Sequence, residues 1–152
     1  MHHKILTPQS LFLIQILATA MMTGIIWFVQ VAHYPLFEKI PKEGFVAYEI
    51  CNTTRTGWVV APIMLVELGS AFLLMVLGSR LGYNPLHLIA LGCLLLIWLS
   101  TFFIQVPLHG ILRHRADIST MEQLVSGNWI RTVLWSLRLL ILSVMISMGK
   151  IF

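Results

Sequence analysis

One polar pattern occurs twice in the sequence, and its spacing constrains the fold. The pattern is a histidine, eighteen intervening residues, and then Asn-x-x-Arg-Thr, and a Phe-x-Gln-Val segment precedes each histidine (28–31 and 103–106). The two copies consist of His33, Asn52, Arg55 and Thr56, and of His109, Asn128, Arg131 and Thr132. Each residue of the second copy follows its counterpart by 76 positions (109 − 33 = 76) in a chain of 152. The repetition predicts an internal duplication, with repeat 1 at about 1–80 and repeat 2 at about 81–152.

The composition is that of an integral membrane protein. Hydrophobic residues make up 58% of the chain and charged residues 11%, with a mean hydropathy of +0.87, which is outside the range of ordinary soluble domains. The net charge of +4 comes from ten Lys and Arg residues scattered singly at segment ends. This scatter suits snorkelling and topology signals and argues against a nucleic-acid partner. Cys51 and Cys93 form no spacing pattern, so a disulfide framework is not expected.

Four apolar segments are long enough to cross a bilayer, which takes about 20 residues. They cover about 11–32, 45–78, 86–106 and 128–149. The first resembles a signal peptide in its basic start, but its apolar run continues to His33, and we expect it to be retained. Pro35 and Pro107 are expected to end the first and third helices. Ser119 or Thr120 is expected to cap a short helix in the last connection.

The sequence therefore predicts an all-α fold, a four-helix transmembrane bundle formed as a single domain over 1–152. A repeat with two crossings returns to its starting side, so the two repeats should be related by a pseudo-twofold axis along the membrane normal. Both polar patterns then lie at the same membrane face. The distribution of Lys and Arg does not decide which face is cytoplasmic.

Polar side chains within the second and fourth segments are expected to face the bundle interior, because ionisable groups are costly in lipid. At 100° per residue, Asn52 and Arg55 share one helix face, and Asn128, Arg131 and Arg138 share another. Two interpretations of Glu67 remain open. It forms a buried ion pair with Arg138, or it serves as a metal ligand or proton acceptor at the floor of a polar pocket.

His33 and His109 are the strongest site candidates. Across a pseudo-twofold axis they would share a transition metal ion or ligate a haem iron from both sides, with Asn52 as a further cofactor-binding residue. Arg55 and Arg131 would hold an anionic oxygen. A structural alternative is equally open: the histidines and Asn52 and Asn128 cap helix ends, and the arginines snorkel to lipid phosphates.

The second repeat resembles a known family. Gln105 to His109 reads Gln-Val-Pro-Leu-His, and Asn128 to Arg131 reads Asn-Trp-Ile-Arg, followed by Trp135. These motifs resemble the signature of the anthrone-oxygenase-like family of small four-helix membrane proteins, which includes fungal enzymes that oxidise polyketide anthrones to quinones and many bacterial members. The resemblance covers the second half well and the first half weakly. It implies roles for His109, Asn128 and Arg131, with His33 and Arg55 as their counterparts, and an inner-membrane location if the source is bacterial.

These observations lead to one functional hypothesis and its competitors. We expect an oxidoreductase or oxygenase that acts on a hydrophobic molecule from the lipid bilayer, with His109, Asn128, Arg131 and Arg55 as catalytic residues. His33, His109 and Glu67 are the expected ligands if a metal is bound. The competing class is a non-enzymatic haem or metal carrier, or a membrane scaffold subunit. A homo-oligomer is also considered, because a small transporter with four helices would need to dimerise.

Overall fold

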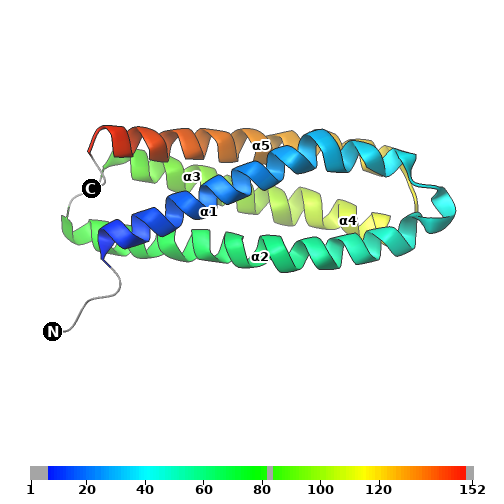
Figure 1. Cartoon of the computed structure of the whole chain (residues 1–152), viewed down its shortest axis with the longest axis horizontal. Helices are drawn as coiled ribbons and strands as arrows, with labels where there is room; N and C mark the ends of the chain where they lie inside the picture. Colours follow the sequence, from blue (N-terminus) through cyan, green and yellow to red (C-terminus); the bar gives the residue numbers. More distant parts are fainter. Residues whose placement is uncertain (1–6, 82–83, 150–152) are drawn as a thin grey trace.

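The computed structural model describes residues 7–81 and 84–149, and all secondary-structure elements in this part of the chain are helices. The helices run along one common axis (Figure 1). In chain order the elements are α1 (Pro8–Phe28), η1 (Val29–His33), η2 (Tyr34–Lys39), α2 (Lys42–Leu81), α3 (Pro85–Ser100), η3 (Thr101–Gln105), α4 (Val106–Leu112) and α5 (Ile118–Ser147).

Two helices begin with a polar cap followed by proline. Thr7 and Ser10 form a reciprocal capping box at the start of α1, and Asn84 accepts a hydrogen bond from the backbone N–H of Leu86 at the start of α3. Pro8 and Pro85 occupy first-turn positions, where the missing N–H costs nothing. These ends therefore satisfy backbone groups that a helix start leaves unpaired.

The expectation that Pro35 and Pro107 end their helices is wrong. Each proline follows a five-residue π-helical turn, η1 or η3, whose last bond is donated by the residue immediately before the proline. The wider turn removes the conflict between the proline ring and the carbonyl oxygen one turn earlier. The chain then continues as the 3-10 helix η2, which begins at Tyr34, and as α4, which begins at Val106.

The second and fourth helices are longer than their apolar segments. Lys42 begins α2, which passes through Pro62 without interruption, and Ile118 begins α5. Asp117, and not Ser119 or Thr120, caps α5, with its carboxylate accepting a hydrogen bond from the Thr120 backbone. Asn52 and Asn128 consequently lie about ten residues inside their helices, so neither is a cap.

Apart from Thr120 and Thr132, the buried positions of α5 follow a regular alternation of three and four residues. They are Met121, Leu124, Asn128, Arg131, Trp135, Arg138, Leu142 and Met145. This spacing places all eight on one stripe, as in a coiled-coil seam. Along this stripe, Trp135 separates the polar pair Asn128 and Arg131 from the single polar residue Arg138, and apolar residues lie at both ends. α5 therefore supplies two separate polar levels between apolar layers. The prediction that Asn128, Arg131 and Arg138 share an inward face is confirmed.

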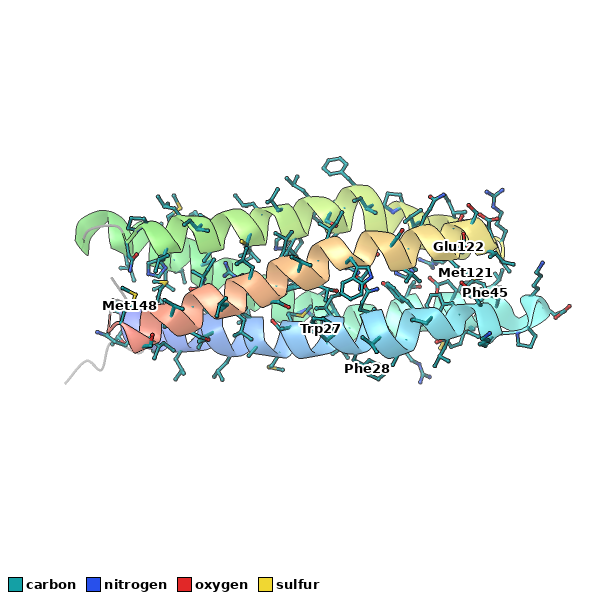
Figure 2. The ribbon with its side chains drawn as sticks, turned by 90° about the horizontal axis from the view of Figure 1, so that it is seen from above. Trp27, Phe28, Phe45, Met121, Glu122 and Met148 are labelled. Atoms are coloured by element: carbon teal, nitrogen blue, oxygen red, sulfur yellow. The ribbon has the colours of Figure 1, made fainter. Side chains whose placement is uncertain are left out.

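The helices pack around α1 and α5. α1 lies against α2 and α5, α3 packs against α5, and α2 and α3 make little contact. The 40–41 connection and the 113–117 connection lie at the same end of the bundle, opposite the start of α1 and the end of α5 (Figure 1). Figure 2 shows Phe45, Met121 and Glu122 toward that end and Met148 toward the other.

The long helices identify a multi-pass membrane protein. Four helical stretches within the described residues are long and apolar enough to cross a membrane: Pro8–Lys39, Lys42–Leu77, Pro85–Leu112 and Ile118–Ser147. Many large apolar side chains on them are exposed, among them Phe28, Trp58 and Phe103, as a lipid-facing surface requires. The prediction of an all-α bundle of membrane-spanning helices is thus confirmed. The tandem repeat and its twofold axis stay predictions.

Candidate functional site

His109 lies at the centre of a hydrogen-bonded network near the end of the bundle that carries the two connections. Its Nδ1 is 2.5 Å from Oε1 of Glu49, and its Nε2 is 2.9 Å from the hydroxyl of Tyr34. The Glu49 side chain is fully buried and that of His109 is mostly buried. A carboxylate at Nδ1 holds the ring proton there and leaves Nε2 as an acceptor. Tyr34 therefore donates to His109, and His109 donates to Glu49.

His33 joins this network on the other side of Glu49. Oε2 of Glu49 accepts a hydrogen bond from Nδ2 of Asn52 at 3.1 Å, and Oδ1 of Asn52 lies 2.9 Å from Nε2 of His33. Asn52 thus bridges a histidine of the first pattern to a carboxylate shared with the second. Tyr34 packs against both histidines, with its ring centre 6.0 Å from that of His33 and 5.7 Å from that of His109.

Arg131 extends the network across α5. Its Nε and Nη2 donate to Oδ1 of Asn128 at 3.0 and 2.5 Å, and Nη2 also donates to the Tyr34 hydroxyl at 3.4 Å. Nδ2 of Asn128 donates to Oε1 of Gln30 at 2.8 Å, and Gln30 donates to the carbonyl oxygen of Val125. The chain of bonds therefore runs without a break from His33 to the backbone of α5.

A cavity of about 350 Å³ adjoins the network. Five residues of the network line it, and most of the other lining residues are apolar; the five are His33, Tyr34, Asn52, His109 and Arg131. The apolar lining includes Met22, Ile25, Ile26, Val29, Val60 and Trp135. Few convergent polar groups on an otherwise apolar wall are the usual features of a small-molecule site.

Arg55 and Glu67 do not belong to this cluster. Arg55 is exposed and does not line the cavity. It lies six residues after Glu49, which turns it about 120° from the inward line of α2. The expected shared face of Asn52 and Arg55 is therefore only half correct, since Asn52 faces the site and Arg55 does not. Glu67 is eighteen residues from Glu49, five full turns, and lies on the same inward line one level deeper.

Glu67 forms the predicted ion pair with Arg138. Nε of Arg138 is 2.8 Å from Oε1 of Glu67, and both side chains are fully buried. The hydroxyl of Thr19 donates to Oε1 at 2.6 Å, Nε1 of Trp135 donates to Oε2 at 3.1 Å, and Arg138 donates to the Ala90 carbonyl. Thr19, Trp135 and Arg138 all donate to the Glu67 carboxylate, which thereby holds α1, α2 and α5 together. None brings Glu67 to His33 or His109.

The donor geometry does not fit the expected metal or haem. Within residues 7–81 and 84–149, no three His, Cys, Asp or Glu side chains are grouped to hold a metal ion. Tyr34 packs against both imidazoles, and its hydroxyl is hydrogen-bonded to Nε2 of His109, so a haem iron ligated at that nitrogen would have to displace it. His33 and His109 are instead engaged by Asn52, Glu49 and Tyr34.

Three residues of the network were missed as site residues by sequence reasoning. Glu49 had a usable signal, because eighteen residues separate it from Glu67 and five helical turns place both on one line. Gln30 is part of the repeated Phe-x-Gln-Val segment, which also pointed to it. Tyr34 had no signal in the sequence, because its contact with both histidines depends on the π turn η1.

Fold and site together define a multi-pass helical membrane protein with a buried histidine, carboxylate and arginine network beside an apolar cavity. No protein-family model, curated protein or solved structure matches this chain.

Proposed function

We propose that the protein is a membrane oxidoreductase that removes a proton from a hydrophobic substrate bound in the cavity. One observation carries this proposal: the unbroken series Glu49, His109 and Tyr34, with Tyr34 and His109 both on the cavity wall. A carboxylate, an imidazole and a hydroxyl in this order form an acid–base relay, in which each group holds the next in a defined protonation state.

The proton moves along existing hydrogen bonds. A substrate proton passes to the Tyr34 oxygen while the Tyr34 proton passes to Nε2 of His109. The imidazolium formed in this way is stabilised by the Glu49 carboxylate at 2.5 Å from Nδ1. Arg131 donates to the same Tyr34 oxygen and supports negative charge that develops there or on the substrate.

The oxidation step follows from the family resemblance. An activated CH2 group that has lost a proton reacts with molecular oxygen, and the overall change converts CH2 and O2 into C=O and H2O. In this scheme the protein contributes proton abstraction, orientation and an apolar environment. Asn128 acts as a positioning residue, because it holds two nitrogens of Arg131.

Oxidation of anthrone by the purified protein in lipid nanodiscs tests the proposal. Quinone absorbance and oxygen uptake are measured for the unaltered protein, Tyr34→Phe and His109→Gln, with exchange of the substrate CH2 protons for deuterium measured without oxygen. Removal of a general acid–base group typically costs about 10²- to 10⁴-fold in rate. Tyr48→Phe and His114→Gln are matched controls, since neither residue lines the cavity. Unchanged exchange in Tyr34→Phe and His109→Gln would contradict the relay.

A further inference from the structure

Arg131 is a buried cation without an anionic partner in the described part of the chain. The residue is 7% exposed, and its hydrogen bonds go to the neutral side chains of Asn128 and Tyr34. The two ion pairs among the described residues engage the nearby carboxylates elsewhere, Glu49 with His109 and Glu67 with Arg138. A buried charge is costly unless it is paired. Arg138 meets this requirement within the protein, and Arg131 does not.

The unpartnered part of the guanidinium belongs to the cavity. Asn128 occupies the edge formed by Nε and Nη2, and Nη1 has no hydrogen-bond partner among the described residues. Arg131 lines the cavity. Because Nη2 also donates to the Tyr34 hydroxyl, the two N–H groups of Nη1 are the ones available to a ligand, and they suit a carboxylate oxygen.

The cavity reaches the side of the bundle between α2 and α4. Its rim includes Thr56 and Gly57 on α2, and Val106 and Gly110 on α4, of which Thr56, Val106 and Gly110 are exposed. These positions lie within the membrane-crossing stretches. A Cβ atom built on Gly57 or on Gly110 would meet no atom within 4 Å. Because α2 also makes little contact with α4, we expect the opening to face lipid.

A second cation marks the outer edge of the opening. Arg113 lines the cavity, is exposed, and directly follows Leu112, the last residue of α4. It is therefore placed at the level of the lipid headgroups, where arginine side chains are favoured. A negatively charged amphiphile approaching from the bilayer meets Arg113 first and Arg131 inside.

We propose that the cavity binds a single-chain amphiphile that carries one carboxylate and reaches it from the bilayer between α2 and α4. The carboxylate pairs with Arg131, and the chain lies along Met22, Ile26, Val60 and Trp135. A volume of about 350 Å³ is at the small end of ligand pockets, roughly 300 to 1,000 Å³, which favours one chain over a two-chain phospholipid. The inference rests on the same cavity as the proposed function but goes beyond it, because it names a ligand of that cavity and not the molecule that is oxidised.

Quenching of tryptophan fluorescence by 11-bromoundecanoate tests this inference, because Trp135 forms part of the cavity wall. The protein is placed in phosphatidylcholine nanodiscs, and the acid is compared with its methyl ester, which partitions into lipid without a charge. We expect saturable quenching by the acid and only gradual, unsaturable quenching by the ester. Arg131→Gln should weaken binding of the acid by about 10- to 100-fold, the loss of one hydrogen-bonded charge.

Two glycine variants separate cavity binding from a general effect of the lipid surface. Gly57→Leu places a side chain at the opening, where its Cβ meets no atom within 4 Å, and Gly69→Leu places the same side chain on the same helix outside the cavity. We expect saturable binding to be lost in the first and kept in the second. Equal saturable binding of acid and ester would overturn the anionic assignment, and unaltered binding in Gly57→Leu would overturn the site.

His109→Gln distinguishes this inference from the proposed function. The variant interrupts the proton relay and leaves Arg131 in place, so it should keep carboxylate binding while proton exchange is lost. Binding of the acid without any turnover in the unaltered protein supports the ligand class and contradicts the relay. Anthrone oxidation together with equal binding of the acid and the ester would support the relay and contradict the ligand class.

Discussion

Trp135 connects the two polar levels of the bundle by donating a hydrogen bond from Nε1 to Oε2 of Glu67 at 3.1 Å. Its ring forms part of the cavity wall, and its nitrogen is bound to the Glu67–Arg138 ion pair. The deeper pair therefore fixes the ring that bounds the cavity. A change at Glu67 should be felt in the cavity even though no atom of Glu67 lines it.

Breaking the buried ion pair should destabilise the protein strongly. Glu67→Gln leaves Arg138 charged and unpaired, and removal of one partner from a buried pair costs about 3 to 5 kcal/mol. The double variant Glu67→Gln with Arg138→Met removes both charges and should recover much of this loss. Unfolding in detergent, followed by circular dichroism, measures both. A double variant less stable than the single one would show that the pair is not the source of the effect.

Gly127→Ala should destabilise the contact between α5 and η3. A Cβ atom at this position would lie 3.0 Å from Cγ2 of Ile104 and 3.3 Å from Nε2 of Gln105. Overpacking of this kind costs about 1 to 3 kcal/mol, partly offset by the better helix propensity of alanine, about 1 kcal/mol. The matched control is Gly92→Ala, where the added atom meets nothing within 4 Å. Thermal unfolding of the two variants should show a lower midpoint for Gly127→Ala only.

The cap of α5 should make stability depend on acidic pH. Hydrogen bonds from the Thr120 hydroxyl and backbone to the Asp117 carboxylate lower the pKa of Asp117 below its ordinary value. A lowered pKa in the folded state stabilises the protein above the unfolded-state pKa, about 3.9, and the gain is lost as the pH falls through the folded-state pKa. Asp117→Ala should therefore be less stable than the unaltered protein at neutral pH.

That difference should shrink as the pH falls below the unfolded-state pKa of about 3.9, because the folded-state pKa lies lower. Unfolding midpoints of both proteins measured from pH 7 down to pH 3 provide the comparison, with Ser119→Ala as a control beside the cap. A constant difference across this range would mean that the Asp117 charge does not contribute.

Asn128→Asp should weaken carboxylate binding by supplying Arg131 with an internal anion. Oδ1 of Asn128 already lies 3.0 Å from Nε and 2.5 Å from Nη2 of Arg131, so a carboxylate at this position would form an ion pair without movement. We expect the affinity for 11-bromoundecanoate to fall by about tenfold or more, as for loss of a charge-assisted bond. Asn128→Ser removes the amide without adding charge and should weaken binding less.

The fold followed from the sequence because apolar length and composition leave few alternatives in a membrane. The buried stripe on α5 could also be predicted from the sequence, since Asn128, Arg131 and Arg138 repeat at helical spacing. The site was only partly predictable. His109, Asn128 and Arg131 do converge, but the equivalence of Arg55 with Arg131 failed, because α2 is turned so that Glu49 and Glu67 face inward and Arg55 outward.

The position of Tyr34 could not be predicted for a different reason. Proline was assumed to end each odd-numbered helix, and the sequence contains no signal for a π turn that lets the helix continue. The turn η1 ends at His33, immediately before Tyr34 and Pro35, and Tyr34 packs against both His33 and His109. Local backbone geometry, and not residue type, decides this contact.

The two histidines lie at different places relative to the π turns. His33 is the last residue of η1, whereas His109 lies four residues after the end of η3, about one helical turn. Nε2 of His33 meets the amide of Asn52, and Nδ1 of His109 meets the carboxylate of Glu49. The same sequence pattern in the two halves has therefore produced two chemically different imidazoles, one backed by an amide and the other by a carboxylate.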